Sequence, residues 1–149
     1  MDINKLRWWQ PKPVLKYPHF NQDDSKIWDS FLISESKRFI RFSYDVPLID
    51  ESRFEGDSPD FLESDWNYLT AYKIDVIGET LDSIILFEVK PILSHMAIGQ
   101  INTYSKLFKI YYSPNKPIVM SIVCLSAPSP LIQACNAMSI MVYVEPANL

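Results

Sequence analysis

The chain has 149 residues, of which 48% are hydrophobic and 21% charged, a composition typical of one globular domain and not of a disordered segment. Its 3 glycines lie far apart, which excludes a glycine-rich phosphate loop and a dinucleotide-binding fingerprint. The formal net charge is −4, whereas a protein that coats nucleic acid without regard to sequence is usually basic.

The first 22 residues form an extended arm in front of the first predicted helix. Prolines keep the run Trp8-Trp9-Gln10-Pro11 extended, and neighbouring side chains of an extended segment point to opposite sides. Trp8 and Trp9 therefore cannot face one core together. We expect both to pack on the outside of the domain, or one of them to meet another molecule. The arm is the candidate contact for a protein partner or for a second copy of the chain.

Residues 23–149 form a single predicted domain. Asp23-Asp24-Ser25 can cap its first helix, and Pro128 or Pro130 can start the last one. The acidic stretch 50–65 is typical of a solvated loop. The order of elements predicts an α/β fold with a central mixed β-sheet flanked by helices. The expected helices span 23–37, 94–111 and 128–137, and the expected strands span 39–48, 68–77, 84–90, 118–125 and 139–144.

Two charged residues end the otherwise apolar strand 84–90. Glu88 and Lys90 share one face because side chains alternate along a strand. The preceding strand carries Asp75 inside an apolar run, and a tight connection near 79–83 brings Asp75 opposite Glu88. Two carboxylates that close repel each other unless a cation lies between them, and magnesium prefers oxygen ligands. Lys90 could then hold a water or neutralise charge on a phosphate.

The helix 94–111 adds polar side chains beside this pair. Gln100 and Tyr104 are four residues apart and share one face, and an amide within an apolar stripe needs a polar partner. Lys106 and Lys109 of the same helix could face a nucleic-acid backbone, although helix lysines are more often simply solvated.

The pattern of Asp75, Glu88-Val89-Lys90 and Gln100-Ile101-Asn102-Thr103-Tyr104 resembles the PD-(D/E)XK nuclease superfamily. The Gln-x-x-x-Tyr helix is similar to the RecB-like branch. The order of helix, three-strand meander, helix and strand is similar to the restriction-endonuclease-like core of that superfamily, to which this chain adds a helix and a strand. The resemblance covers about residues 23 to 125. Ile74 stands where the signature has proline, and no basic DNA-binding appendage is visible.

The resemblance implies a DNA nuclease that uses magnesium or manganese. Asp75, Glu88 and the Val89 carbonyl would bind the metal, and Lys90 would position the attacking water. Glu35, near the end of the first helix, matches the acidic residue that many members place there, and Asp29 is its competitor.

The same resemblance implies substrate contacts and partners. Gln100 and Tyr104 would orient the site or contact the DNA backbone. Small transposition subunits, phage endonucleases and junction resolvases resemble the chain in size. We therefore expect DNA as substrate, delivered by a protein partner or bound by an oligomer.

A second class of function stays open. The fold could serve as a structural or adaptor component of a phage particle or a DNA-processing assembly, which would bind through residues 1–20 and cut no DNA. The sequence leaves open which DNA structure is recognised and whether cutting is endonucleolytic or exonucleolytic.

Membrane and disulfide classes are not expected. The chain has neither an apolar run near the ~18 residues that span a bilayer nor the core of a signal peptide. We therefore expect no membrane contact and a cytoplasmic location, or a place in the virion if a phage encodes the chain. Cys124 and Cys135 lie in apolar surroundings without metal-ligand spacing, so we expect buried thiols.

Overall fold

The elements follow the predicted order. The computed structural model describes residues 1–50 and 69–146, so the expected acidic loop at 50–65 lies almost entirely outside the described residues. Two short 3-10 turns, η1 (Ile3–Lys5) and η2 (Ser36–Arg38), accompany the main elements. These are α1 (Gln22–Glu35), β1 (Arg41–Leu48), β2 (Tyr72–Glu79), β3 (Ile84–Val89), α3 (His95–Tyr112), β4 (Ile118–Cys124), α4 (Ser129–Ala137) and β5 (Ile140–Val144).

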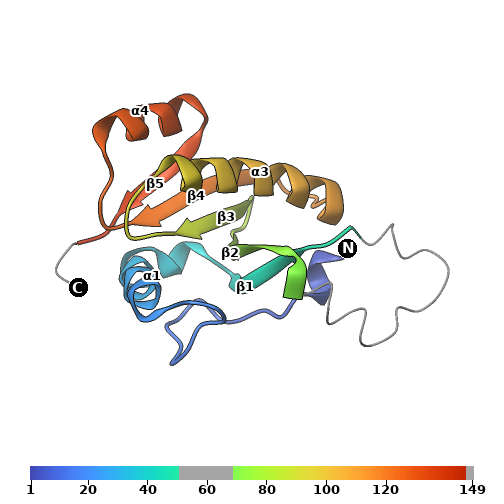
Figure 1. The fold of residues 1–149 in the computed structure, drawn as a ribbon. Coiled ribbons are helices and arrows are strands. Elements are labelled where there is room, and N and C mark those ends of the chain that lie inside the picture. The colour runs from blue at the N-terminus through green and yellow to red at the C-terminus, as the bar shows by residue number, and fades with distance from the viewer. Residues whose placement is uncertain (51–68, 147–149) are drawn as a thin grey trace.

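One five-stranded sheet has the strand order β1-β2-β3-β4-β5. β1, β2 and β3 run antiparallel, because a short turn joins β2 to β3, whereas β4 and β5 run parallel to β3. Parallel neighbours need a crossover, which α3 and α4 supply. In Figure 1, α3 and α4 lie on one side of the sheet and α1 on the other. The predicted α/β class with a mixed sheet flanked by helices is confirmed.

Local capping decides where the helices begin. Ser94 accepts a hydrogen bond from the Ala97 backbone N–H at the start of α3, as predicted. The cap of α1 was assigned wrongly: Asn21, and not the run from Asp23, accepts from the backbone N–H of Asp24. β2 also runs to Glu79, two residues beyond the predicted end, because it pairs there with Ile84 of β3.

Each face of the sheet carries its own hydrophobic cluster. On the α3 side, strand residues such as Leu86 and Ile122 pack with Ile101 and Phe108 of the helix. The cluster on the α1 side is rich in aromatic rings, with Trp28 at its centre, fully buried. Apolar burial of this extent is the main stabilising contribution in a domain of this size.

The N-terminal arm extends the sheet at its β1 edge. The backbone N–H of Trp9 donates to the Phe42 carbonyl at 2.7 Å, and the Phe42 N–H donates back at 2.9 Å. Trp8 then packs with the cluster on the α3 side and Trp9 with the cluster on the α1 side. Both tryptophans therefore pack on the domain, on opposite faces, as the alternation of an extended chain requires. A protein contact through the arm stays a prediction.

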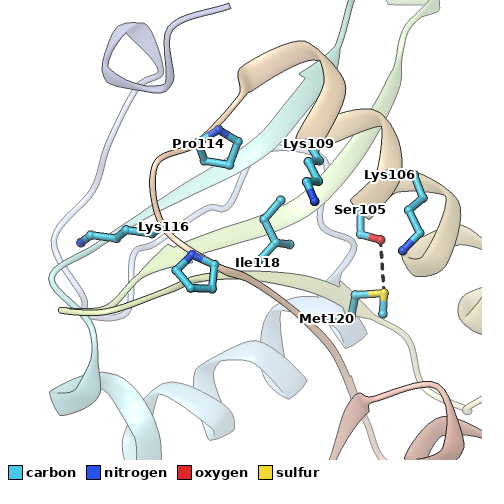
Figure 2. Close-up of a pocket in the computed structure, with 8 residues that line it drawn as sticks. Ser105, Lys106, Lys109, Pro114, Lys116, Ile118 and Met120 are labelled. Carbon is cyan, nitrogen blue, oxygen red and sulfur yellow. Dashed lines mark hydrogen bonds between the residues drawn. The ribbon is translucent and has the colours of Figure 1, made fainter.

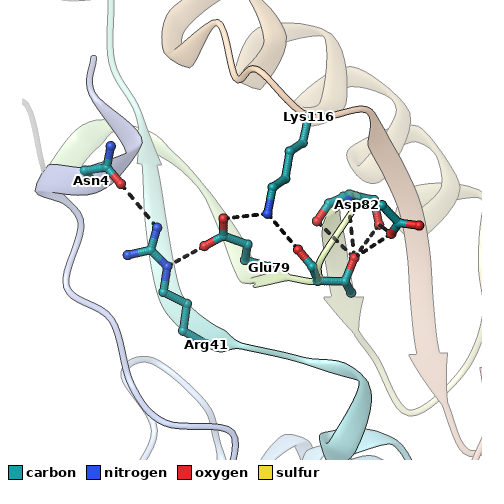
Figure 3. A network of polar contacts seen from close by, with 7 residues as sticks. Asn4, Arg41, Glu79, Asp82 and Lys116 are labelled. Carbon is teal, nitrogen blue, oxygen red and sulfur yellow. Dashed lines mark hydrogen bonds and ion pairs between the residues drawn. The ribbon is translucent and has the colours of Figure 1, made fainter.

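An ion-pair network closes the sheet at the turn between β2 and β3 (Figure 3). The Glu79 carboxylate accepts from the Arg41 guanidinium and from Lys116 Nζ, the latter at 2.9 Å. Lys116 also donates to the Thr80 carbonyl at 2.8 Å, and Arg41 donates to Asn4 of the arm at 3.2 Å. The network thus joins the arm, β1, β2 and the connection that leads into β4.

Two further expectations concern the cysteines and the membrane. Cys124 and Cys135 are free and buried, as predicted. Within residues 1–50 and 69–146, none of the helices combines the length and the apolar character that a bilayer crossing requires.

Candidate active site

The antiparallel pairing of β2 and β3 brings two carboxylates together. Val76 pairs with Phe87, which places Asp75 opposite Glu88 in the next position of the ladder. The Asp75 Oδ2 accepts a hydrogen bond from the Val89 backbone N–H at 2.9 Å. Glu88 is only 2% exposed, and Asp75 is partly buried. The hairpin thus produces the juxtaposition that the sequence predicted.

Both carboxyl groups resist ionisation in this position. Burial raises the pKa of Glu88, and the negative charge of Asp75 raises it further. Burial also raises the pKa of Asp75, although the Val89 N–H and the charge of Lys90 offset part of that rise. Lys90 lowers the pKa of both groups, so its ammonium acts on both carboxylates. A second positive charge at the pair would stabilise both ionised carboxylates.

Two buried oxygen atoms, one on strand β3 and one on α3, have no hydrogen-bond partner. They are Glu88 Oε2 and Gln100 Oε1, and the third such atom among the described residues is Ser121 Oγ. A buried acceptor without a donor costs free energy, so native proteins rarely keep one without a use for it. Tyr104 lies beside them: burial raises its pKa, Gln100 offsets part of the rise, and the charge of Glu88 adds to it. The face of α3 that carries Gln100 and Tyr104 therefore borders the carboxylates.

The acidic residue that α1 places near the site is Asp24 and not Glu35. Burial raises the pKa of Asp24, and the charge of Asp75 raises it further. Glu35 lies eleven residues later, about 16 Å along the helix axis, where it pairs with Arg38 at 2.6 Å. Asp29, the competitor, accepts a hydrogen bond from the Tyr17 hydroxyl. The structure therefore brings neither predicted residue of α1 to the carboxylates, because the start of the helix faces them.

The regular alternation of side chains between the two faces of the sheet is interrupted at one residue of β1. Tyr44 and Val76 pair and pack on the α1 side, whereas the next pair, Val46 and Ile74, packs on the α3 side. Asp45 lies between them with φ of 54°, in the left-handed region that residues other than glycine seldom adopt. This local backbone conformation accompanies the change of face beside the site.

Asp45 brings a further buried charge to the neighbourhood. It is 7% exposed, and His19 Nε2 lies 3.0 Å from its Oδ2. Sequence reasoning missed both Asp24 and Asp45. The signal for Asp45 was available, because it interrupts an apolar strand just as Asp75 does. Asp24 gave no such signal, since acidic residues are common in the first turn of any helix.

Lys106 and Lys109 do not lie at the carboxylates. They project from α3 at about 120° and 180° around the helix axis from Gln100. Both line a separate cavity of about 230 Å³ between α3 and the start of β4 (Figure 2). The floor of that cavity includes Ile118 and Met120. Gln100 and these two lysines therefore lie on different faces of α3, as their spacing of six and nine residues in the sequence indicates.

The residues present fit a hard divalent cation held by few protein ligands. The described part of the chain has no group of three His, Cys, Asp or Glu side chains that could hold a metal ion. Asp75 and Glu88 supply two carboxylates, and the Val89 carbonyl is a third oxygen on the same edge. In an extended strand the N–H and C=O of one residue point to the same side, and the Val89 N–H faces Asp75. Magnesium is commonly bound through one or two carboxylates, waters and substrate phosphates.

Comparison with known proteins gives structural neighbours only. No protein-family model matches the chain, and no curated protein sequence matches it. It is similar to the crystal structure of a repair endonuclease from Pyrococcus abyssi, with 20% identity and a TM-score of 0.43 over 50% of this chain and 33% of that chain. It is also similar to the structure of an EndoMS–dsDNA2 complex, with 14% identity and a TM-score of 0.48 over 91% of this chain and 51% of that chain. The chain thus spans about half or less of the length of these neighbours, and the likeness concerns the fold.

Proposed function

We propose that the protein is a magnesium- or manganese-dependent DNA nuclease. The observation that carries the proposal is the Asp75–Glu88 pair, in which the buried Glu88 Oε2 has no hydrogen-bond donor. Lys90 stands next to the pair, and the order of these residues resembles the PD-(D/E)XK superfamily with a RecB-like Gln-x-x-x-Tyr helix. Buried polar groups in native proteins mostly have a hydrogen-bond partner, and a bound cation would give Glu88 Oε2 one.

Each residue has a role that its position supports. Asp75, Glu88 and the Val89 carbonyl hold the cation, and the Val89 N–H fixes one oxygen of Asp75 at 2.9 Å. When bound, the cation lowers the pKa of a water and offsets the negative charge that develops on the phosphate.

The remaining residues act on the water and the substrate. Lys90 orients the attacking water and adds positive charge near the phosphate. Gln100 and Tyr104, on the face of α3 that borders the carboxylates, contact the DNA backbone or orient the site. Asp24, at the start of α1, takes the place that the resemblance assigned to Glu35.

The test is hydrolysis of DNA by the purified protein. We expect cleavage with magnesium or manganese and none with EDTA. Asp75→Asn and Lys90→Met should each abolish cleavage, whereas Asp23→Asn, which changes an exposed carboxylate in the first turn of α1, should retain it. Circular dichroism and thermal unfolding show whether each variant folds.

Two results would contradict the proposal. Cleavage that survives both Asp75→Asn and Lys90→Met would place the activity elsewhere. A folded wild-type protein that binds manganese in calorimetry but cuts neither single-stranded nor duplex DNA would instead favour the structural or adaptor role, in which only the fold is kept.

A further inference from the structure

We infer that Tyr72 is a stacking platform for a DNA base, so that the site accepts single-stranded or locally unpaired DNA in preference to continuous duplex. The inference rests on the proposed function, since it names the substrate of the same site. Tyr72 is the first residue of β2, three positions before Asp75.

The two rings beside the site form an exposed aromatic pair. The Tyr72 ring lies 5.9 Å from the Tyr104 ring, centroid to centroid, with the planes tilted by 33°. Tyr72 is nevertheless 67% exposed, so its ring rests on Tyr104 with most of its surface open. A large aromatic side chain normally gains from burial, and one that stays open beside polar catalytic groups is typical of a binding surface.

Tyr104 connects this platform to the carboxylates. It shares the face of α3 with Gln100, whose Oε1 is one of the buried atoms without a partner. Met96 continues the same face one turn earlier and is 73% exposed. A DNA strand with one phosphate at Asp75 and Glu88 would therefore find an apolar and aromatic protein surface for the bases next to that phosphate.

The chemistry of the platform selects the form of the DNA. Base faces inside a duplex are covered by their neighbours, so a ring can stack only on a base that has left the helix or was never paired. Stacking on an aromatic side chain tolerates every base, because each has a π face. Tyr72 thus favours unpaired DNA without demanding a sequence.

Binding is measured in EDTA, where no metal-dependent hydrolysis occurs, by fluorescence anisotropy of a labelled, non-self-complementary single strand and of the duplex that it forms with its complement. We expect tighter binding of the single strand by the wild-type protein. Tyr72→Ala should weaken single-strand binding about fivefold or more, Tyr72→Phe should keep it, and the duplex should be less affected. Ile110→Ala is the matched control, because Ile110 on α3 is equally exposed at 67%.

A second readout separates stacking from a merely structural role. A single strand that carries 5-iododeoxyuridine should crosslink to Tyr72 on irradiation, as located by mass spectrometry. The crosslink should persist in Tyr72→Phe and vanish in Tyr72→Leu.

Three outcomes would overturn the inference. They are equal affinity for single strand and duplex, unchanged affinity in Tyr72→Ala, and crosslinks that form only at other residues. If single-strand binding depends on Tyr72 in a protein that cuts no DNA, the stacking inference is supported and the proposed nuclease activity is contradicted. The experiment therefore distinguishes a failure of the inference from a failure of the proposed function.

Discussion

Strand β2 carries two carboxylates, Asp75 near its middle and Glu79 at its end, and their surroundings differ in opposite directions. Glu79 accepts from Arg41 and Lys116, and although burial alone would raise its pKa, these partners lower it. Asp75 sits opposite Glu88, and the pKa of each is raised, first by burial. Figure 3 shows the satisfied end, where every oxygen of Glu79 meets a cation.

The difference separates structure from function. At the Glu79 end, charge and packing are both complete, so the group serves the fold. Around Asp75 the protein keeps two acidic groups side by side, and the buried Glu88 has an acceptor without a donor, which costs stability. The proposed divalent cation would supply positive charge to both carboxylates and a partner to the unsatisfied oxygen.

The largest expected effect comes from exchanging carboxylate for amide in each of these two surroundings. Glu88→Gln should lower cleavage on the order of 100-fold or more, because it removes a proposed metal ligand, while leaving the metal-free protein as stable or more so. Glu79→Gln should leave cleavage near normal but lower the free energy of unfolding by about 1–2 kcal/mol, because it leaves Arg41 and Lys116 poorly paired. Cleavage assays and urea unfolding measure the two effects.

The contrast between the two carboxylates is wrong if Glu79→Gln loses cleavage or if Glu88→Gln loses stability instead of cleavage. An inactive but stable Glu79→Gln would place the chemistry at Glu79. An active but unstable Glu88→Gln would show that Glu88 stabilises the fold and is not needed for cleavage.

Packing at the Glu79 end gives the next test. A Cβ on Gly78 would lie 2.7 Å from Cδ1 of the Phe39 ring and 2.8 Å from the Phe42 ring. Gly78→Ala should therefore lower the free energy of unfolding by about 1–3 kcal/mol. Gly99→Ala is the control, since nothing lies within 4 Å of its Cβ and alanine favours a helix by about 0.5–1 kcal/mol. A Gly78→Ala protein as stable as Gly99→Ala would contradict the tight packing.

The last test is the dependence of stability on pH. Because the folded pKa of Glu88 is raised above its ordinary value of 4.5, its contribution to stability is complete below that pH and is lost as the pH rises through the raised pKa. Metal-free protein should become less stable over that range, by at most about 1.4 kcal/mol per pH unit for one group. Glu88→Gln should flatten the curve, and Mn²⁺ should raise the melting temperature most at the alkaline end. A wild-type curve that rises with pH in EDTA would contradict the raised pKa.

The sequence by itself determined the order of elements and the pair of carboxylates. The caps, the period-two runs and the short turn after Glu79 are local features, and a hairpin between known strands leaves little freedom in which residues oppose each other. The sequence alone therefore predicted that Asp75 and Glu88 lie opposite each other. The same reasoning identified the Gln100 and Tyr104 face of α3, because residues four apart on a helix are neighbours.

Only the tertiary structure decided which side chains from other elements join that pair. Asp24 reaches the site in place of Glu35 because the direction of α1 across the sheet depends on long-range packing of Trp28 and Phe31 against the strands. The open ring of Tyr72 on Tyr104 likewise depends on how α3 lies over β2. Helix and strand periods specify the face on which a residue lies, whereas the element that the face meets is set by burial summed over the whole domain.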